Sequence, residues 1–277
     1  VYMNRFVQLA SYLNIVGKSL RLIQTPPALY YDRKGDKHYS NTEELKQNYN
    51  FNGKNIISIS PGGWQGFYML GITKYIRDHY DLKDFIYTGA SAGAWNSLFF
   101  SYKKDHNELY NTITKNLEQS KHIAHVETDL KHLILAKYSS RDFSLDKMFL
   151  TVTTLRPYIV QTHVYFNFHS LEDAVDCCIA SSHIPFITST RMVNRYDGRA
   201  TFDGGLSMFP YLDVSHPRLH ITPNLWNKTS FQTMKPYNRI DTLVNQGYYN
   251  TQQNAKWLDQ IFHTNKSIVA NSIFYPR

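Results

Sequence analysis

Hydrophobic and polar positions follow a repeating order in the central part of the chain. A short apolar run at Asn55–Ser60 predicts a buried strand, and the helical spacing of apolar residues over Gly66–His79 predicts a helix. The same order returns at once, with a second strand predicted at Phe85–Thr88 and an apolar helix that reaches about Tyr102. Repeated strand, turn and helix is typical of a parallel sheet with crossover helices, so the expected fold class is α/β.

The alternation continues towards the C-terminus. Residues 106–137 have a helical, partly charged pattern, and Ile240–His263 predicts a closing helix with polar interruptions. Ser170 and Asp173 have the spacing of a capping box, which predicts that a helix begins there and runs to Ser182. The remaining apolar runs predict strands at Met148–Leu155, Tyr158–Phe168, Arg199–Phe202 and Arg218–Thr222.

The first 54 residues have a different pattern. Apolar residues at helical spacing over residues 4–23 predict an amphipathic helix that ends before Pro26. Core-facing apolar stripes are commoner than membrane-facing ones, so we expect this helix to dock on its own domain, with an interfacial helix as the alternative. Residues 30–54 are polar and loop-like, and Ser40 and Glu43 suggest the start of a short helix. We expect residues 1–54 to pack on a single domain formed by residues 55–277.

Composition narrows the class of protein. A chain of 277 residues with 42% hydrophobic content can bury one large core, and its net charge of +8 favours anionic partners. The basic residues are scattered and show no zinc-finger spacing, so binding to nucleic acid is not expected. No apolar run is long enough to predict a transmembrane segment. The adjacent Cys177 and Cys178 are unsuited to a cross-link, which fits an intracellular protein, soluble or peripheral on a membrane.

A G-x-S-x-G sequence at residues 89–93 is the first feature that indicates chemistry. Small residues around Ser91 allow a sharp turn between strand and helix, which exposes the hydroxyl at the edge of the sheet. The helix that follows directs its positive N-terminal end at the same hydroxyl. We therefore expect Ser91 to be a nucleophile, with an incidental serine in a tight turn as the alternative.

A glycine-containing loop at residues 60–66 is suited to bind an oxyanion. Gly62, Gly63 and Trp64 offer successive backbone N–H groups at the turn between a predicted strand and a predicted helix. The loop lacks the G-K-[ST] ending and the G-x-G-x-x-G spacing of nucleotide-binding loops, so a nucleotide site is not expected. These three residues are the predicted oxyanion hole.

The predicted nucleophile also needs a base. Asp203 follows the predicted strand Arg199–Phe202 and precedes two glycines, which allow a turn with close approach of the backbone. An aspartate in this position can also be only a turn residue. Because Ser91 needs a partner, we predict that Asp203 is the base.

Taken together, these motifs resemble those of the patatin-like phospholipases over residues 55–210. The shared order is a Gly-Gly loop, a G-x-S-x-G turn about 30 residues later and a D-G-G motif, and Ala180–Phe186 is similar to the family's A-S-x-x-x-P-F segment. The resemblance implies a three-layer α/β/α fold with a mostly parallel central sheet. It also implies a Ser91–Asp203 dyad that cleaves fatty-acyl esters of lipids or phospholipids, as in phospholipase A and lysophospholipase, with neither cofactor nor metal at the dyad and with a membrane surface as a partner.

The glycine loop departs from the family pattern G-G-G-x-[RK]-G at two positions. Pro61 replaces the first glycine and has no N–H to donate, and Gln65 replaces the basic residue. Two other functions are compatible with the sequence. A Ser–His–Asp esterase would use His216 or His220, which follow Asp203 in the chain order of α/β-hydrolases. A catalytically weak or inactive relative would use the fold only to bind lipid.

Overall fold

The computed structural model describes residues 26–117, 123–156, 159–207, 212, 214–226 and 240–262. The amphipathic helix predicted over residues 4–23 lies outside these residues, as does His263 at the end of the predicted closing helix. Within the described residues, no helix combines the length and the apolar character needed to cross a bilayer.

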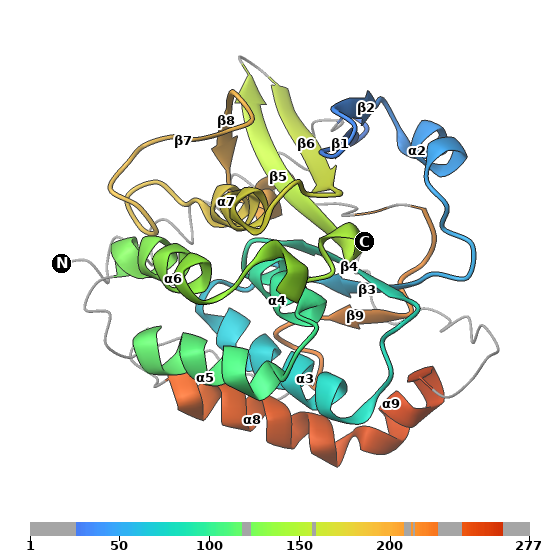
Figure 1. The fold of residues 1–277 in the computed structure, drawn as a ribbon, viewed down its shortest axis with the longest axis vertical. Coiled ribbons are helices and arrows are strands. Elements are labelled where there is room, and N and C mark those ends of the chain that lie inside the picture. The colour runs from blue at the N-terminus through green and yellow to red at the C-terminus, as the bar shows by residue number, and fades with distance from the viewer. Residues whose placement is uncertain are drawn as a thin grey trace.

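One sheet runs through the centre of the described chain (Figure 1). Its main path has the order β2-β1-β6-β5-β4-β3-β9, and β8 pairs with both β5 and β7. The central strands β9, β3, β4 and β5 are parallel to one another, whereas β6 and β8 are antiparallel to β5. The strands are β1 (Leu29–Asp32), β2 (Lys37–Tyr39), β3 (Asn55–Ile59), β4 (Phe85–Ala90), β5 (Met148–Arg156), β6 (Ile159–Phe166), β7 (Asn194–Tyr196), β8 (Arg199–Phe202) and β9 (Leu219–Ile221).

Successive strand residues point to opposite faces of the sheet, and both faces pack against helices. Most of the described helices lie on one face, and α2 lies on the other. On one face, Ile57 packs with α3 and Leu150 packs with α4 and α7. On the other face, Ile56 and Phe149 pack with Leu45 of α2. The arrangement confirms the predicted three-layer α/β/α fold with a mostly parallel central sheet. The helices are α2 (Thr42–Asn48), α3 (Gly66–His79), α4 (Ala92–Ser101), α5 (His106–Leu117), α6 (Ile123–Lys137), α7 (Leu171–Ser182), α8 (Ile240–Gln253) and α9 (Ala255–Phe262).

Apolar spacing and capping residues in the sequence predicted the position of several helices correctly. The helix predicted over Gly66–His79 has these bounds as α3. Ser170 caps α7, as predicted, because its hydroxyl accepts a hydrogen bond from the Asp173 N–H at 3.1 Å. The short helix α2 is present, but its cap is Asn41 rather than Ser40, so that prediction was wrong by one residue.

The prediction that residues 30–54 are loop around one short helix was wrong in part. Strand β1 pairs in parallel with β6, and β2 pairs antiparallel with β1 at the edge of the sheet. Both strands are too short for a hydrophobic alternation to stand out among polar neighbours. Tyr30 is nevertheless almost fully buried, so this segment contributes to the core.

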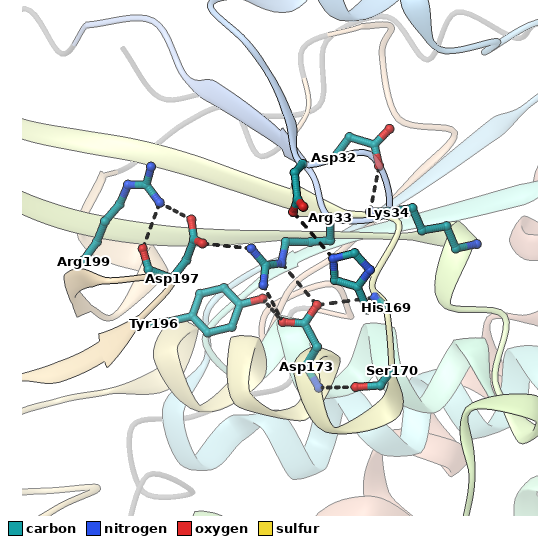
Figure 2. A network of polar contacts seen from close by, with 10 residues as sticks. Asp32, Arg33, Lys34, His169, Ser170, Asp173, Tyr196, Asp197 and Arg199 are labelled. Carbon is teal, nitrogen blue, oxygen red and sulfur yellow. Dashed lines mark hydrogen bonds and ion pairs between the residues drawn. The ribbon is translucent and has the colours of Figure 1, made fainter.

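A charged network fastens this N-terminal hairpin to the rest of the domain (Figure 2). Arg33, just after β1, donates two hydrogen bonds to the carboxylate of Asp173 on α7 and one to Asp197. The hydroxyl of Tyr196 donates to the same Asp173 at 2.8 Å, and Arg199 pairs with Asp197. A bidentate contact between a guanidinium and a carboxylate fixes the relative orientation of the two side chains as well as pairing their charges. The network therefore holds the β7–β8 hairpin, which leads directly to Asp203.

Candidate active site

Ser91 lies at a sharp turn between β4 and α4. Its backbone has φ 56° and ψ −126°, a region that residues other than glycine rarely adopt. Two glycines make the turn possible: a Cβ atom on Gly89 would lie 2.3 Å from the Gly93 carbonyl oxygen, and one on Gly93 would lie 2.2 Å from the Ile59 carbonyl oxygen. The G-x-S-x-G sequence thus forms the strained turn that its spacing predicts.

Two strands approach the same point of β5 from opposite directions. Strand β4 runs parallel to β5 and ends at Ala90, which pairs with Thr151. Strand β8 runs antiparallel to β5 and ends at Phe202, which pairs with Thr153. The residue that follows each strand therefore lies level with Val152 of β5, where the two segments meet.

Those next residues are Ser91 and Asp203, and they form a buried hydrogen bond. The Ser91 hydroxyl donates to Asp203 Oδ2 at 2.6 Å. The other carboxylate oxygen, Oδ1, accepts the backbone N–H of Gly205 at 2.7 Å, and the Asp203 N–H donates to the His183 carbonyl. Burial raises the pKa of Asp203 to about 6, although both hydrogen bonds oppose the shift. At neutral pH the carboxylate is thus ionised and more basic than an ordinary aspartate.

Ser181 supports the Ser91 turn, and the sequence analysis did not single it out. Its hydroxyl accepts the Ser91 N–H at 2.8 Å and donates to the Thr151 carbonyl at 2.6 Å. The only sequence signal for this role was its place in the Ala180–Phe186 segment. Ser181 is fully buried, so both hydrogen bonds are protected from water.

The predicted oxyanion loop lies beside this turn. A Cβ atom on Gly66 would lie 2.6 Å from the Ala92 Cβ, which shows how closely the loop approaches the residue after Ser91. Gly63 has a φ of 49°, and within the described part of the chain the N–H groups of Gly62 and Gly63 have no hydrogen-bond partner. Gly63 and Trp64 line the same cavity as Ser91. The loop thus presents unused donors next to the Ser91 hydroxyl.

The two departures from the family pattern occupy packed positions. Pro61 lies against the turn after Asp203, because a Cβ on Gly205 would be 2.8 Å from the proline Cγ. Gln65 is only 2% exposed, so a neutral side chain stands at a buried position of the loop. Pro61 therefore contacts the segment that carries the carboxylate, even though it cannot donate a hydrogen bond.

An apolar cavity of about 200 Å³ opens beside Ser91. It extends between α3, α4, α5 and α6, and the segment after α7 closes one side with Ile184 and Ile187. Its dimensions and lining suit a hydrocarbon chain rather than a polar ligand. Its apolar lining includes Phe67, Leu70, Leu98, Phe99, Leu109, Ile113, Leu130 and Ile134.

One acidic side chain, Glu127 of α6, also lines this cavity. It is hydrogen-bonded to the hydroxyl of Ser182, which also accepts the indole N–H of Trp95 at 3.0 Å. Burial raises the pKa of Glu127 to about 8, and the negative charge of Asp203 adds to the shift. Sequence reasoning missed Glu127, because a charged residue on a partly charged helix has the pattern of a solvent-facing position.

The histidines of the alternative triad lie elsewhere. His220, on β9, is hydrogen-bonded through Nε2 to the Ser60 hydroxyl at 2.8 Å, and burial lowers its pKa. His216 is exposed in the segment before β9. The described contacts bring neither histidine to Ser91 or Asp203. Within the described residues, no three His, Cys, Asp or Glu side chains lie together in a group that could hold a metal ion.

Comparison with known proteins agrees with these motifs. A sequence model of the patatin-like phospholipases matches residues 57–214, which is more than half of the chain. The matched part begins in β3 and includes the glycine loop, the Ser91 turn and Asp203. Comparison with curated proteins gave no match. The extent of the family match shows that the chain belongs to the patatin-like phospholipase family.

Proposed function

We propose that the protein cleaves fatty-acyl esters of lipids, as a phospholipase A or lysophospholipase, through an acyl-enzyme on Ser91 with Asp203 as the base. Members of the family are generally hydrolases of lipid esters. The observation that carries the proposal is the 2.6 Å hydrogen bond from the Ser91 hydroxyl to Asp203 at the edge of an apolar cavity. The cavity would hold the acyl chain with its ester at the hydroxyl.

The reaction would proceed in two halves. Asp203 accepts the Ser91 proton while the oxygen attacks the ester carbonyl carbon, and the N–H groups of Gly62, Gly63 and Trp64 stabilise the resulting oxyanion. Collapse of the intermediate breaks the ester C–O bond, and the proton on Asp203 passes to the departing alcohol. Water then gives a proton to Asp203 and attacks the acyl-enzyme, and the fatty acid leaves as Ser91 regains its proton.

Three features of the site favour this assignment over a lipid-binding protein without activity. The strained backbone of Ser91 costs stability and orients a hydroxyl that simple binding does not need. Asp203 is buried and ionised next to that hydroxyl, which is also costly. The positive end of α4 begins at the following residue and favours a negative charge there.

The test measures fatty-acid release from mixed phospholipid vesicles by wild type, Ser91→Ala and Asp203→Asn, with and without a calcium chelator. We expect release by wild type only, unchanged by the chelator, and labelling of Ser91 by a fluorophosphonate probe. If wild type and both variants are equally inert and unlabelled while all three bind the vesicles, the enzyme assignment fails and the lipid-binding function replaces it.

A further inference from the structure

A turn beside the cavity exposes apolar side chains. This 184–193 turn follows α7, and its Phe186 and Met192 are 67% and 66% exposed. In the same turn, Ile184 and Ile187 line the cavity next to Ser91. The segment thus has one apolar side directed into the cavity and another directed into solvent.

Hydrogen bonds fix the shape of this turn. The N–H groups of Ile187 and Thr188 both donate to the Ile184 carbonyl at 3.1 Å, and the Ile184 N–H donates to the Thr188 hydroxyl at 3.0 Å. Phe186 has a φ of 61°, in the left-handed region that is unfavourable for a residue with a side chain. An exposed phenylalanine gains no packing in return, so the conformation suggests a functional use for its outward orientation.

The charged side chains of residues 183–196 have one sign. Arg191 and Arg195 are exposed, and neither forms an ion pair with a described residue. Residues 183–196 contain no aspartate or glutamate. The next acidic residue, Asp197, is already paired with Arg33 and Arg199. Apolar groups flanked by unpaired cations match a lipid surface that carries negative headgroups.

We propose that the 184–193 turn docks the protein on an anionic lipid surface. Phe186 and Met192 enter the boundary between headgroups and acyl chains, and Arg191 and Arg195 contact the headgroups. The proposal rests on the proposed lipid hydrolase function, because docking through this turn brings the cavity beside Ser91 to the substrate. The apolar surface then continues from the bilayer along the turn into the cavity.

Binding is measured by sedimentation of sucrose-loaded lipid vesicles. The protein used is Ser91→Ala, so that the lipid stays intact. The vesicles contain phosphatidylcholine alone or an equimolar mixture with phosphatidylserine. The test variant is Phe186→Asn with Met192→Gln, because asparagine tolerates a positive φ and the fold is then preserved. The control is Tyr249→Ser, which removes an aromatic side chain that is 57% exposed on α8. Circular dichroism and thermal unfolding verify folding of each variant.

The contribution of the two arginines to vesicle binding is tested with a second double variant and a matched control. Arg191→Gln with Arg195→Gln removes two exposed charges, one in the turn and one in β7 just after it. Lys54→Gln with Lys83→Gln removes two exposed charges just before β3 and β4, whereas Ser91 follows the carboxyl end of β4. Both pairs change the net charge equally, so a difference between them reports position. Raising the salt concentration should weaken wild-type binding, since exposed charges are screened.

We expect each turn variant to weaken binding to the phosphatidylserine vesicles at least about tenfold and each control to bind like the Ser91→Ala parent. With Ser91 restored, kcat/KM for a short, water-soluble ester should be the same with and without the turn substitutions. Unchanged binding by the turn variants, or equal loss in the controls, would overturn the proposal. Docking through the turn by a protein that cleaves no ester would overturn the proposed function and leave the docking site standing.

Discussion

Ser91 donates its hydroxyl proton to Asp203 at a place where no described lysine or arginine pairs with the carboxylate. Among the described residues, two neutral donors, the Ser91 hydroxyl and the Gly205 N–H, compensate for its burial. The pKa of Asp203 is raised to about 6 for this reason. A cation at hydrogen-bond distance would stabilise the carboxylate but would also make it a weaker base.

The first prediction concerns the pH dependence of activity. Asp203 must be ionised to accept the Ser91 proton, so kcat/KM should rise with pH through a midpoint of about 6 and reach its maximum above about pH 7. A water-soluble ester avoids changes in the lipid surface itself. A midpoint near the ordinary aspartate pKa of about 4, or a profile with no acidic limb, would argue against Asp203 as the base.

The same shift predicts a change in stability with pH. Between pH 4 and 6, roughly, the folded protein holds a proton on Asp203 that the unfolded chain has released, so stability falls as pH rises through this window. Asp203→Asn removes the effect. The free energy of unfolding of Asp203→Asn, relative to that of wild type, should therefore increase by about 2–3 kcal/mol between pH 4 and 7. Urea unfolding measures this difference.

Asp36→Asn is the control for this measurement, because it removes an exposed carboxylate at the start of β2. A gain between pH 4 and 7 as large in Asp36→Asn as in Asp203→Asn would show that the effect does not depend on burial. A constant difference between Asp203→Asn and wild type would mean that the carboxylate is not destabilised by burial.

Ser181→Ala should weaken the site without touching its reacting groups. The substitution leaves the Ser91 N–H and the Thr151 carbonyl without their buried partner, at a cost of about 1–3 kcal/mol. We expect a lower unfolding temperature and a lower kcat with little change in KM. Ser97→Ala is the matched control, because that buried hydroxyl only donates to the Gly93 carbonyl one turn earlier in α4. Equal effects of the two substitutions would contradict a positioning role for Ser181.

The features that the sequence predicts are those encoded locally. The bounds of α3 follow from its apolar spacing, and the cap of α7 follows from Ser170 and Asp173. Strands β1, β2 and β7 contain only three or four residues and lie among polar or charged neighbours, so no apolar run marks them. The equally short β8 is marked instead by the D-G-G motif that follows it. Their pairing is decided by tertiary contacts.

The site has the same division between local and non-local information. The motifs around Ser91 and Asp203 identify both residues, but their meeting depends on the registers of β4 and β8 against β5, between residues far apart in the chain. No pattern within either motif contains that register. Glu127 is the opposite case, since nothing in its neighbourhood distinguishes it from the other charged residues of α6 until the fold places it at the cavity.

Glu127 gives the last prediction, which concerns the alkaline side of the pH profile. Because the pKa of Glu127 is raised to about 8, its carboxyl is neutral at pH 7 and can donate to the Ser182 hydroxyl, whose own proton reaches the Cys178 carbonyl at 2.8 Å. Above about pH 8 the carboxyl ionises and puts a negative charge into the apolar cavity, close to Asp203. Acyl chains then bind less well, and the oxyanion formed at Ser91 is repelled.

Wild-type kcat/KM for a long-chain ester should therefore decline above about pH 8, whereas Glu127→Gln, which keeps the shape and hydrogen bond but cannot ionise, should remain level. A short-chain ester that leaves the cavity unfilled should show a smaller decline in wild type. Glu172→Gln, at an exposed position of α7, is the control and should follow wild type. A decline that persists in Glu127→Gln would place the responsible proton on another group, and the acidic limb near pH 6 should be the same in all three proteins because it belongs to Asp203.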